Sequence, residues 1–413
     1  MTVSSRYGWV MLVLAAFAMV ATLPGRTHGL GMITERMLAD PSLGIDRLAF
    51  SEINFRATLL GGLFCLPCGW LIDRLGLKTT LTVTVRALAL AVRCMTRLSG
   101  RWGPELEVAI LLTRGFGQSA LSVISITMVG KWFSRRTTWA MSVYSLLLSL
   151  GFALSAQLAR PWANADWRVV WDTMGYALLA FVPLCLILCR DPAPVAAEIS
   201  PALSVPSECC AASGTDAAQS LTLPQALWSQ TFWLFALSTS LVGLISSGMS
   251  LFNESVLKQQ GFSKDVFYNL ITLTGMVGLL TKLPIGWLGE RFALNRLLAA
   301  GLILQSACLI AFPFVTTLTG VSLYGAGMGI SGTITTVLFF SIWSRAFGRR
   351  HLGKIQAVAQ LLTVIASASG PVLLARCLER FDSYSPAFMI LAGTSACLAV
   401  WACCVSPPRP CEA

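Results

Sequence analysis

The chain has 413 residues, of which 55% are hydrophobic and only 12% are charged. About a quarter of the residues of a soluble globular protein are charged, so the composition excludes that class and indicates a polytopic membrane protein. The formal net charge of +11 would suggest nucleic-acid binding in a soluble protein, but no basic stretch carries interleaved aromatic residues, so no nucleic-acid partner is expected.

Twelve apolar segments follow one another along the chain, each long enough to cross a bilayer as a helix of roughly 20 residues. The first resembles a signal peptide in isolation, but no small-residue cleavage site follows it, so we expect it to be the first span. The expected spans are residues 8–33, 51–72, 79–97, 106–130, 139–160, 171–189, 231–255, 266–288, 294–315, 319–344, 353–376 and 385–404.

Residues 190–226, between the sixth and seventh spans, are rich in Pro, Ala and Ser and lack hydrophobic periodicity. This composition is typical of a flexible linker. We therefore expect an N-terminal bundle of six helices at 1–189, a cytoplasmic linker at 190–226 and a C-terminal bundle of six helices at 227–413. The densest Lys and Arg clusters fall in short loops on the side of both termini, which predicts cytoplasmic termini. The membrane is expected to be the plasma (inner) membrane.

Two motifs of the first half recur in the second half. The turn Gly69-Trp70-Leu71-Ile72-Asp73-Arg74 recurs 217 residues later as Gly286-Trp287-Leu288-Gly289-Glu290-Arg291. Phe133-Ser134-Arg135-Arg136 recurs 214 residues later as Phe347-Gly348-Arg349-Arg350. Two motifs at nearly one offset predict an all-α membrane protein of twelve helices in two pseudo-symmetric six-helix bundles.

The stretch Gly69–Lys78 resembles the signature loop G-x-L-x-D-R-x-G-x-K/R of the major facilitator superfamily (MFS), and Arg114–Gln118 resembles the second motif of that family. By this resemblance, which covers essentially the whole chain, it is identified as a member. The segments Lys131–Arg136 and Ser250–Glu254 are more similar to the monocarboxylate and oxalate–formate carriers. The resemblance implies the MFS fold and transport by alternating access.

The repeated turn is expected to act as a latch between the halves. Asp73 can lie against the positive N-terminus of a helix or against an arginine of the other half, and glycines let helix ends approach closely. Such a contact would hold one side shut and break when the halves rock. The expected gating residues are Gly69, Asp73, Arg74, Gly76, Lys78, Arg135, Arg136, Gly286, Glu290 and Arg291.

Six basic residues fall inside the expected spans, whereas all acids fall in loops or at span ends. Burying a charge in a span is costly, so these residues are expected to mark function, and a core with cations alone suits an anionic substrate. The six are Arg26, Arg56, Arg86, Arg93, Arg114 and Lys282. Arg86, Arg93 and Arg97 form one stripe of span three, for which contact with anionic lipid or a partner helix is one explanation.

The candidate substrate-binding residues are Arg26, His28, Arg56 and Arg114. A guanidinium group binds a carboxylate through two parallel hydrogen bonds, which is the chemistry expected of Arg26 and Arg114. Alternatives stay open: Arg56 extending to the membrane surface, Arg114 bonded to backbone carbonyls, and His28 as a satisfied polar residue instead of a proton carrier.

The sequence therefore predicts a monomeric secondary or facilitative carrier of a small organic anion, with a coupling proton or a counter-anion and with membrane lipids as neighbours. A nitrate/nitrite-type transporter of inorganic anions and a non-transporting sensor derived from a carrier are the alternatives. No enzyme is expected, since the chain lacks the G-x-S-x-G, H-E-x-x-H and phosphate-loop motifs. Its cysteines lack the partners of a zinc site, so neither metal nor cofactor is expected.

Overall fold

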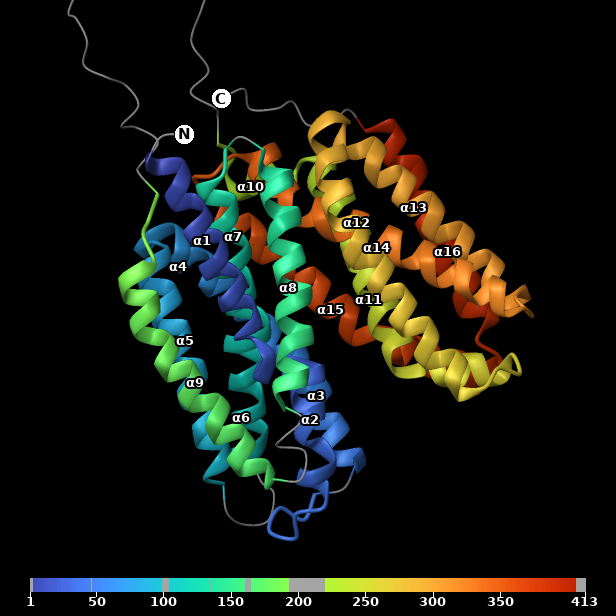
Figure 1. Cartoon of the computed structure of the whole chain (residues 1–413), viewed down its shortest axis with the longest axis horizontal. Coiled ribbons are helices and arrows are strands. Elements are labelled where there is room, and N and C mark those ends of the chain that lie inside the picture. The colour runs from blue at the N-terminus through green and yellow to red at the C-terminus, as the bar shows by residue number, and fades with distance from the viewer. Residues whose placement is uncertain are drawn as a thin grey trace, which may run out of the picture.

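The computed structural model describes residues 3–45, 47–98, 104–134, 136–159, 165–192 and 220–405, and these residues are helical without any strand (Figure 1). The N-terminal half contains α1 (Val3–Val20), η1 (Leu23–Gly25), α2 (Thr27–Leu38), α3 (Arg47–Gly62), α4 (Cys65–Leu75), α5 (Leu77–Thr96), α6 (Pro104–Thr113), η2 (Arg114–Leu121), α7 (Ser122–Trp132), α8 (Thr137–Ala159) and α9 (Trp167–Leu188). The C-terminal half contains α10 (Leu223–Leu227), α11 (Gln230–Gln259), α12 (Lys264–Arg291), α13 (Leu294–Ala311), η5 (Phe312–Phe314), α14 (Leu318–Phe347), α15 (Leu352–Phe381) and α16 (Ser385–Cys404).

These helices account for the twelve expected spans, so the predicted fold class is confirmed. Ten of the described segments are long and apolar enough to cross a membrane. The other two spans are the first, which is interrupted between α1 and α2, and α5, which carries Arg86 and Arg93. Most of the expected linker, residues 193–219, lies outside the described residues, and the linker's last part includes most of the short helix α10.

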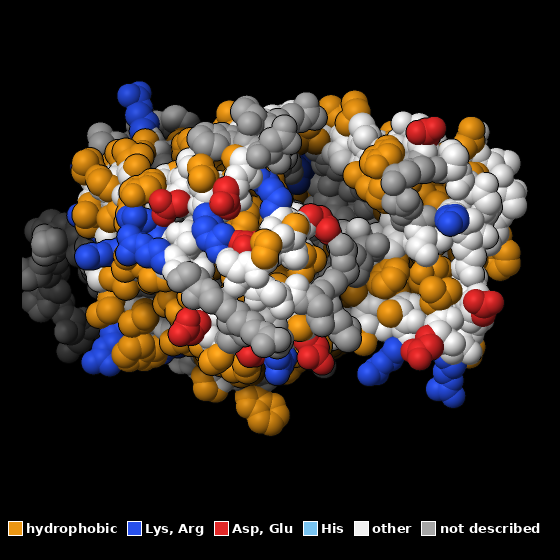
Figure 2. Space-filling model, turned by 90° about the horizontal axis from the view of Figure 1, so that it is seen from below, with side chains coloured by type: hydrophobic (Ala, Val, Ile, Leu, Met, Phe, Trp, Pro, Cys, Tyr) orange, Lys and Arg blue, Asp and Glu red, His pale blue; other side chains and the backbone are white. Residues whose placement is uncertain are grey.

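The two halves meet at one end of the molecule and diverge toward the other (Figure 1). Helix α1 begins and α16 ends at the closed end, which we call the terminal face; the opposite end is the open face. Near the terminal face α15 packs against α4 and α7, and α8 packs against α12 and α14. Figure 2 looks onto the open face, where the surface is hollowed between the halves. The conformation is thus closed at the terminal face.

The first span breaks where it crosses the fourth. Pro24 has no amide hydrogen for a helical bond, and the chain forms a short 3-10 turn before α2 begins at Thr27. Opposite this break the fourth span widens into the π-helical segment η2, and such segments are frequent at functional sites. A Cβ on Gly25 would lie 2.5 Å from the Thr113 carbonyl oxygen and 2.7 Å from the Gln118 nitrogen, so two backbones touch directly here.

The loop after α2 is fixed to the start of α9 at the open face. Trp167 Nε1 donates to Asp40 Oδ2 at 2.9 Å, and Arg168 forms an ion pair with the same carboxylate. Burial alone would raise the pKa of Asp40, but hydrogen bonds from Trp167, Ser42 and Arg168 outweigh it and hold that pKa below its usual value. The carboxylate therefore stays charged and anchors the end of α2.

We predict that Gly25→Ala lowers the apparent melting temperature of the purified protein. The added methyl group would press on backbone atoms of the fourth span, and overpacking of this kind costs about 1–3 kcal/mol. Gly31→Ala is the matched control, because a Cβ on Gly31 would have nothing within 4 Å. Equal melting temperatures for the two variants would contradict the close crossing.

Candidate functional site

Arg26 lies at the break in the first span, half-buried between the broken helix and the fourth span. Its Nε donates to Thr22 Oγ1 at 2.6 Å, and its Nη2 donates to Ser122 Oγ at 3.1 Å and to Met19 Sδ at 3.0 Å. The guanidinium carbon stands 5.3 Å from the centre of the Phe152 ring. All these partners are neutral. They satisfy the hydrogen-bond donors of Arg26 but supply no negative charge to balance its positive charge.

Arg114 is 2% exposed and begins the π-helical segment η2. Its Nε and Nη2 both donate to Asn54 Oδ1, at 3.2 and 2.5 Å. Its Nη1 donates to the Gly25 carbonyl at 3.1 Å, to Thr27 Oγ1 at 3.2 Å and to Gln118 Oε1 at 2.9 Å. In this conformation Arg114 therefore joins the first, second and fourth spans, through one backbone carbonyl and three side chains.

The two guanidinium groups lie at the same break: Arg114 donates to Gly25 and Thr27, the chain neighbours of Arg26, and Arg26 donates to Ser122 just after η2. Within the described residues neither Arg26 nor Arg114 forms an ion pair with a carboxylate. Two like charges removed from water carry a desolvation cost that hydrogen bonds to neutral groups offset only in part. A bound anion would compensate both charges.

Arg56 and Arg93, by contrast, have acidic partners. Arg56 Nε lies 3.4 Å from Glu107 Oε1, and both side chains are exposed, by 53% and 37%. Arg93 Nε lies 3.1 Å from Asp172 Oδ1, and its Nη2 donates to the Tyr176 hydroxyl at 2.9 Å. This pair ties α5 to α9 and gives Arg93 the partner-helix role that the sequence left open.

Four further residues singled out in the sequence contribute nothing described to this cluster. The side chain of His28 and all of Arg135 lie outside the described residues. Arg86 and Arg97, the other members of the stripe on α5, are exposed. None of these positions contributes a described contact to the Arg26–Arg114 cluster.

Lys282 on α12 is a buried cation that the sequence analysis counted but did not place in the site. Its side chain is 9% exposed, and its Nζ donates to Ser145 Oγ on α8 at 2.9 Å. The neighbouring Tyr144 shares a 2.6 Å hydrogen bond with Ser125, and its ring packs 5.4 Å from the Phe340 ring on α14. Lys282 thus lies between the halves. The sequence feature that could have identified it is a lysine inside a span with no acidic residue beside it.

Asp73 connects the halves at the terminal face. Its side chain is only 4% exposed, and Lys131 Nζ lies 2.9 Å from its Oδ1. The backbone amides of Gly353 and Lys354 donate to its two carboxylate oxygens at 3.2 and 3.1 Å. These amides belong to the first turn of α15, where a carboxylate satisfies unpaired N–H groups and complements the helix dipole.

Glu290 makes the corresponding contact from the other half. Its Oε1 accepts from the backbone amide of Trp139, in the first turn of α8, at 3.0 Å. Arg345 Nη1 lies 3.8 Å from Glu290 Oε2 and donates to Thr138 Oγ1 at 2.6 Å. Each half therefore places an acid on the beginning of a helix in the other half.

The glycines of the repeated turn allow this approach. A Cβ on Gly69 would lie 2.5 Å from the Gly353 carbonyl oxygen, and one on Gly286 would lie 2.1 Å from Ser142 Oγ. Gly76 has a φ of +84°, which side-chain-bearing residues rarely adopt. Gly69 therefore lets α4 meet the Gly353 backbone of α15, and Gly286 leaves room for the Ser142 side chain of α8.

The basic residues of the turn are exposed and stack on its tryptophans. The Arg74 guanidinium lies 4.9 Å from the Trp70 ring centre, and that of Arg291 lies 4.0 Å from the Trp287 ring centre. The other predicted basic residues, Lys78 and Arg136, are also exposed. Sequence reasoning missed Lys131 and Arg345, which pair with the two acids, because neither belongs to the repeated turn.

Comparisons with known proteins agree with this architecture. The chain is 24% identical over 360 residues to a gallate transporter of Pseudomonas putida, covering 81% of this chain and 78% of that protein. Its fold is similar to those of the proton:xylose symporter XylE (TM-score 0.70, 14% identity, 99% and 98% of the two chains covered) and the human organic anion transporter MFSD10 (TM-score 0.63, 17% identity, 97% and 98% covered). The family model described as Major Facilitator Superfamily matches residues 9–278 and 236–412. The chain is therefore an integral membrane protein that belongs to the Major Facilitator Superfamily.

Proposed function

We propose that this protein is a secondary carrier that moves a small organic anion across the membrane by alternating access, without converting it chemically. The observation that carries the proposal is the pair Arg26 and Arg114, two guanidinium groups at one break in the first span with neutral partners. One buried and one half-buried cation without a carboxylate partner are costly. A negatively charged substrate compensates this cost, whereas a sugar or a cation does not.

The gallate transporter supports the same substrate class, because gallate is an organic anion. The structural neighbours support the fold alone, since they include a xylose symporter as well as an organic anion transporter. The choice between a neutral and an anionic substrate therefore rests on the charges of this chain and on the gallate transporter.

We assign different tasks to the cations. Arg26 is half-buried and offers its guanidinium fork to a carboxylate, with the Phe152 ring beside it. Arg114 holds the break in the first span through its hydrogen bond to the Gly25 carbonyl, and it adds a second positive charge near Arg26. Lys282 supplies a cation from the other half, on the interface that must open toward the terminal face. Arg56, paired with Glu107, contributes at the rim.

The cycle follows from the contacts at the terminal face. The bundles 1–189 and 227–413, joined by the linker 190–226, rock about the substrate as two units. Asp73 of α4, bound to the first turn of α15, and Glu290 of α12, bound to the first turn of α8, hold the terminal face shut while the open face is accessible. We further propose that the termini are cytoplasmic in a plasma (inner) membrane, that the carrier works as a monomer, and that a proton or a counter-anion is coupled to transport.

We predict that Arg26→Lys weakens the affinity for the transported anion about tenfold and that Arg26→Gln weakens it further. Lysine keeps the charge but loses the planar fork, and a hydrogen bond to a charged group contributes about 1.5–3 kcal/mol. The measurement is uptake into liposomes at matched protein levels, over a panel of mono- and dicarboxylates, nitrate and neutral sugars. Preference for nitrate over carboxylates would favour an inorganic anion instead.

Arg86→Gln is the matched control, since Arg86 is an exposed arginine within span three. Its uptake should equal that of the wild type. Transport of a neutral solute that is indifferent to both Arg26 variants would contradict the anion proposal. Binding of an anion without flux would contradict transport and favour a sensor.

A second prediction concerns Lys282, which contributes an uncompensated charge to the closed interface. Lys282→Met should raise the apparent melting temperature without substrate, because a buried ammonium group is removed. The same change should reduce transport about tenfold or more, whereas Lys282→Arg should retain part of it. A variant with normal flux would contradict a role in transport.

The latch prediction is that Asp73→Asn and Glu290→Gln each slow transport several-fold and that the double variant is slower than either. Each change removes a carboxylate from a helix N-terminus, an interaction of about 0.3–2 kcal/mol. Asp265→Asn is the control, since Asp265 is an exposed acid in the first turn of α12, at the open face. Unchanged flux with normal amounts of variant in the membrane would contradict the latch.

A further inference from the structure

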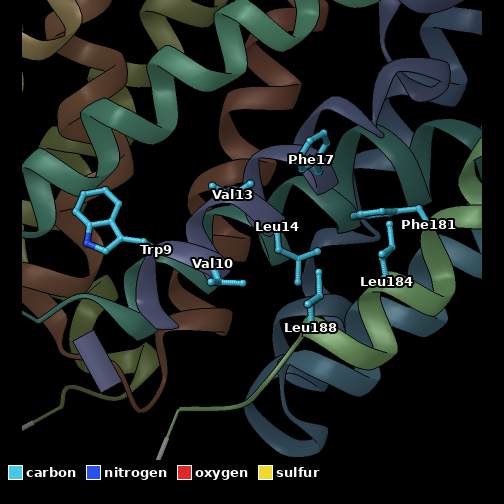
Figure 3. A pocket seen from close by; sticks show the side chains of 8 residues that line it. All are labelled: Trp9, Val10, Val13, Leu14, Phe17, Phe181, Leu184 and Leu188. Atoms are coloured by element: carbon cyan, nitrogen blue, oxygen red, sulfur yellow. The ribbon is translucent and has the colours of Figure 1, made fainter. Parts of the chain in front are cut away.

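An apolar groove runs between α1 and α9 on the membrane-facing side of the N-terminal half (Figure 3). Its volume is about 440 Å³, within the range of about 300–1,000 Å³ that ligand pockets have. Leu14 of α1 points toward Leu184 and Leu188 of α9 across the gap. The lining is entirely apolar and consists of Trp9, Val10, Val13, Leu14, Phe17, Phe181, Leu184 and Leu188.

The groove is open along its length. Val13 is 43% exposed and Phe17 is 62% exposed, although both lie in a segment that crosses the bilayer. Since lipid is the solvent at this depth, acyl chains are the groups available to fill an apolar groove there. The groove therefore has the chemistry of a site for a hydrocarbon tail.

Aromatic residues mark where the groove meets the membrane surface. The Tyr7 and Trp132 rings lie 5.5 Å apart, and Trp9 packs edge-on against Phe133 at 5.3 Å. Trp and Tyr collect at the level of the lipid head groups. The terminal-face end of the groove thus lies where the head group of a bound lipid would lie.

Two arginines stand at that same end. The Arg190 guanidinium lies 4.6 Å from the Tyr7 ring centre, and the Tyr7 hydroxyl donates to the carbonyl of Leu188, the last groove residue of α9. Arg6 is exposed on α1, and Trp9 and Val13 follow it at spacings of three and seven residues, which puts all three on one helix face. Arg6 therefore continues the groove stripe into the head-group region.

We propose that this groove binds an anionic phospholipid from the leaflet at the terminal face. Its tail occupies the space between α1 and α9, and its phosphate binds Arg6 and Arg190. Guanidinium groups recognise phosphate through two hydrogen bonds in addition to charge. The site lies outside the cation cluster at Arg26, and the inference does not depend on the transported substrate.

The test is lipid binding to the full-length protein in detergent, after delipidation, with phosphatidylglycerol and phosphatidylcholine of equal tail length as probes. Native mass spectrometry gives the ratio of the two affinities. The wild type should prefer phosphatidylglycerol, and Arg6→Gln/Arg190→Gln should weaken its binding about 30-fold. Val13→Trp, which fills the groove, should weaken both lipids, and Arg190→Lys should keep most of the preference.

Arg296→Gln is the matched control, because Arg296 is an exposed arginine at the start of α13, also on the terminal face. It should retain the wild-type preference, and the melting temperature of each variant without lipid reports that it is folded. Equal binding of the two lipids by the wild type would overturn the proposal. So would an unchanged preference in the double arginine variant, or unchanged lipid binding by Val13→Trp.

Discussion

The contact of a carboxylate with the first amides of a helix in the opposite half is the interaction on which this conformation depends. A helix begins with amide groups that have no partner within the helix, and its dipole favours negative charge there. Asp73 provides this charge for α15, and Glu290 provides it for α8. Because both contacts lie at the terminal face, the halves meet there and diverge toward the open face.

The same geometry relates the latch to the charges farther inside. Lys282 lies on α12, which ends in the turn that carries Glu290, and its ammonium group rests on α8, the helix that Glu290 caps. In the proposed cycle, opening the terminal face separates α8 from α12 and exposes Lys282 to water or to the substrate. One helix pair therefore carries both the contact that holds the face shut and a cation whose burial opposes closure.

Features with a local signature could be predicted from the sequence. The repeated turn predicted the fold of two bundles, and it offered a helix N-terminus or an arginine of the other half as the partner of Asp73. The partners of Arg114 could not be predicted, since Asn54 lies 60 residues away and reaches it only through the packing of α3 on η2. The pair Arg93–Asp172 joins helices 79 residues apart for the same reason.

The two halves of the chain are alike at the turns of the terminal face but differ in the spans that carry the buried cations. The turns at the terminal face are repeated almost residue for residue, down to Arg74 on Trp70 and Arg291 on Trp287. The spans behind them are not repeated: the first is broken at Leu23–Gly25 and the fourth contains η2, whereas α11 and α14 run unbroken for 30 residues each. In the proposed cycle, rocking of two similar bodies requires matching contacts on both, whereas recognition of the proposed anion requires charges placed differently in each. The guanidinium pair in one half and the single ammonium group in the other meet that second requirement.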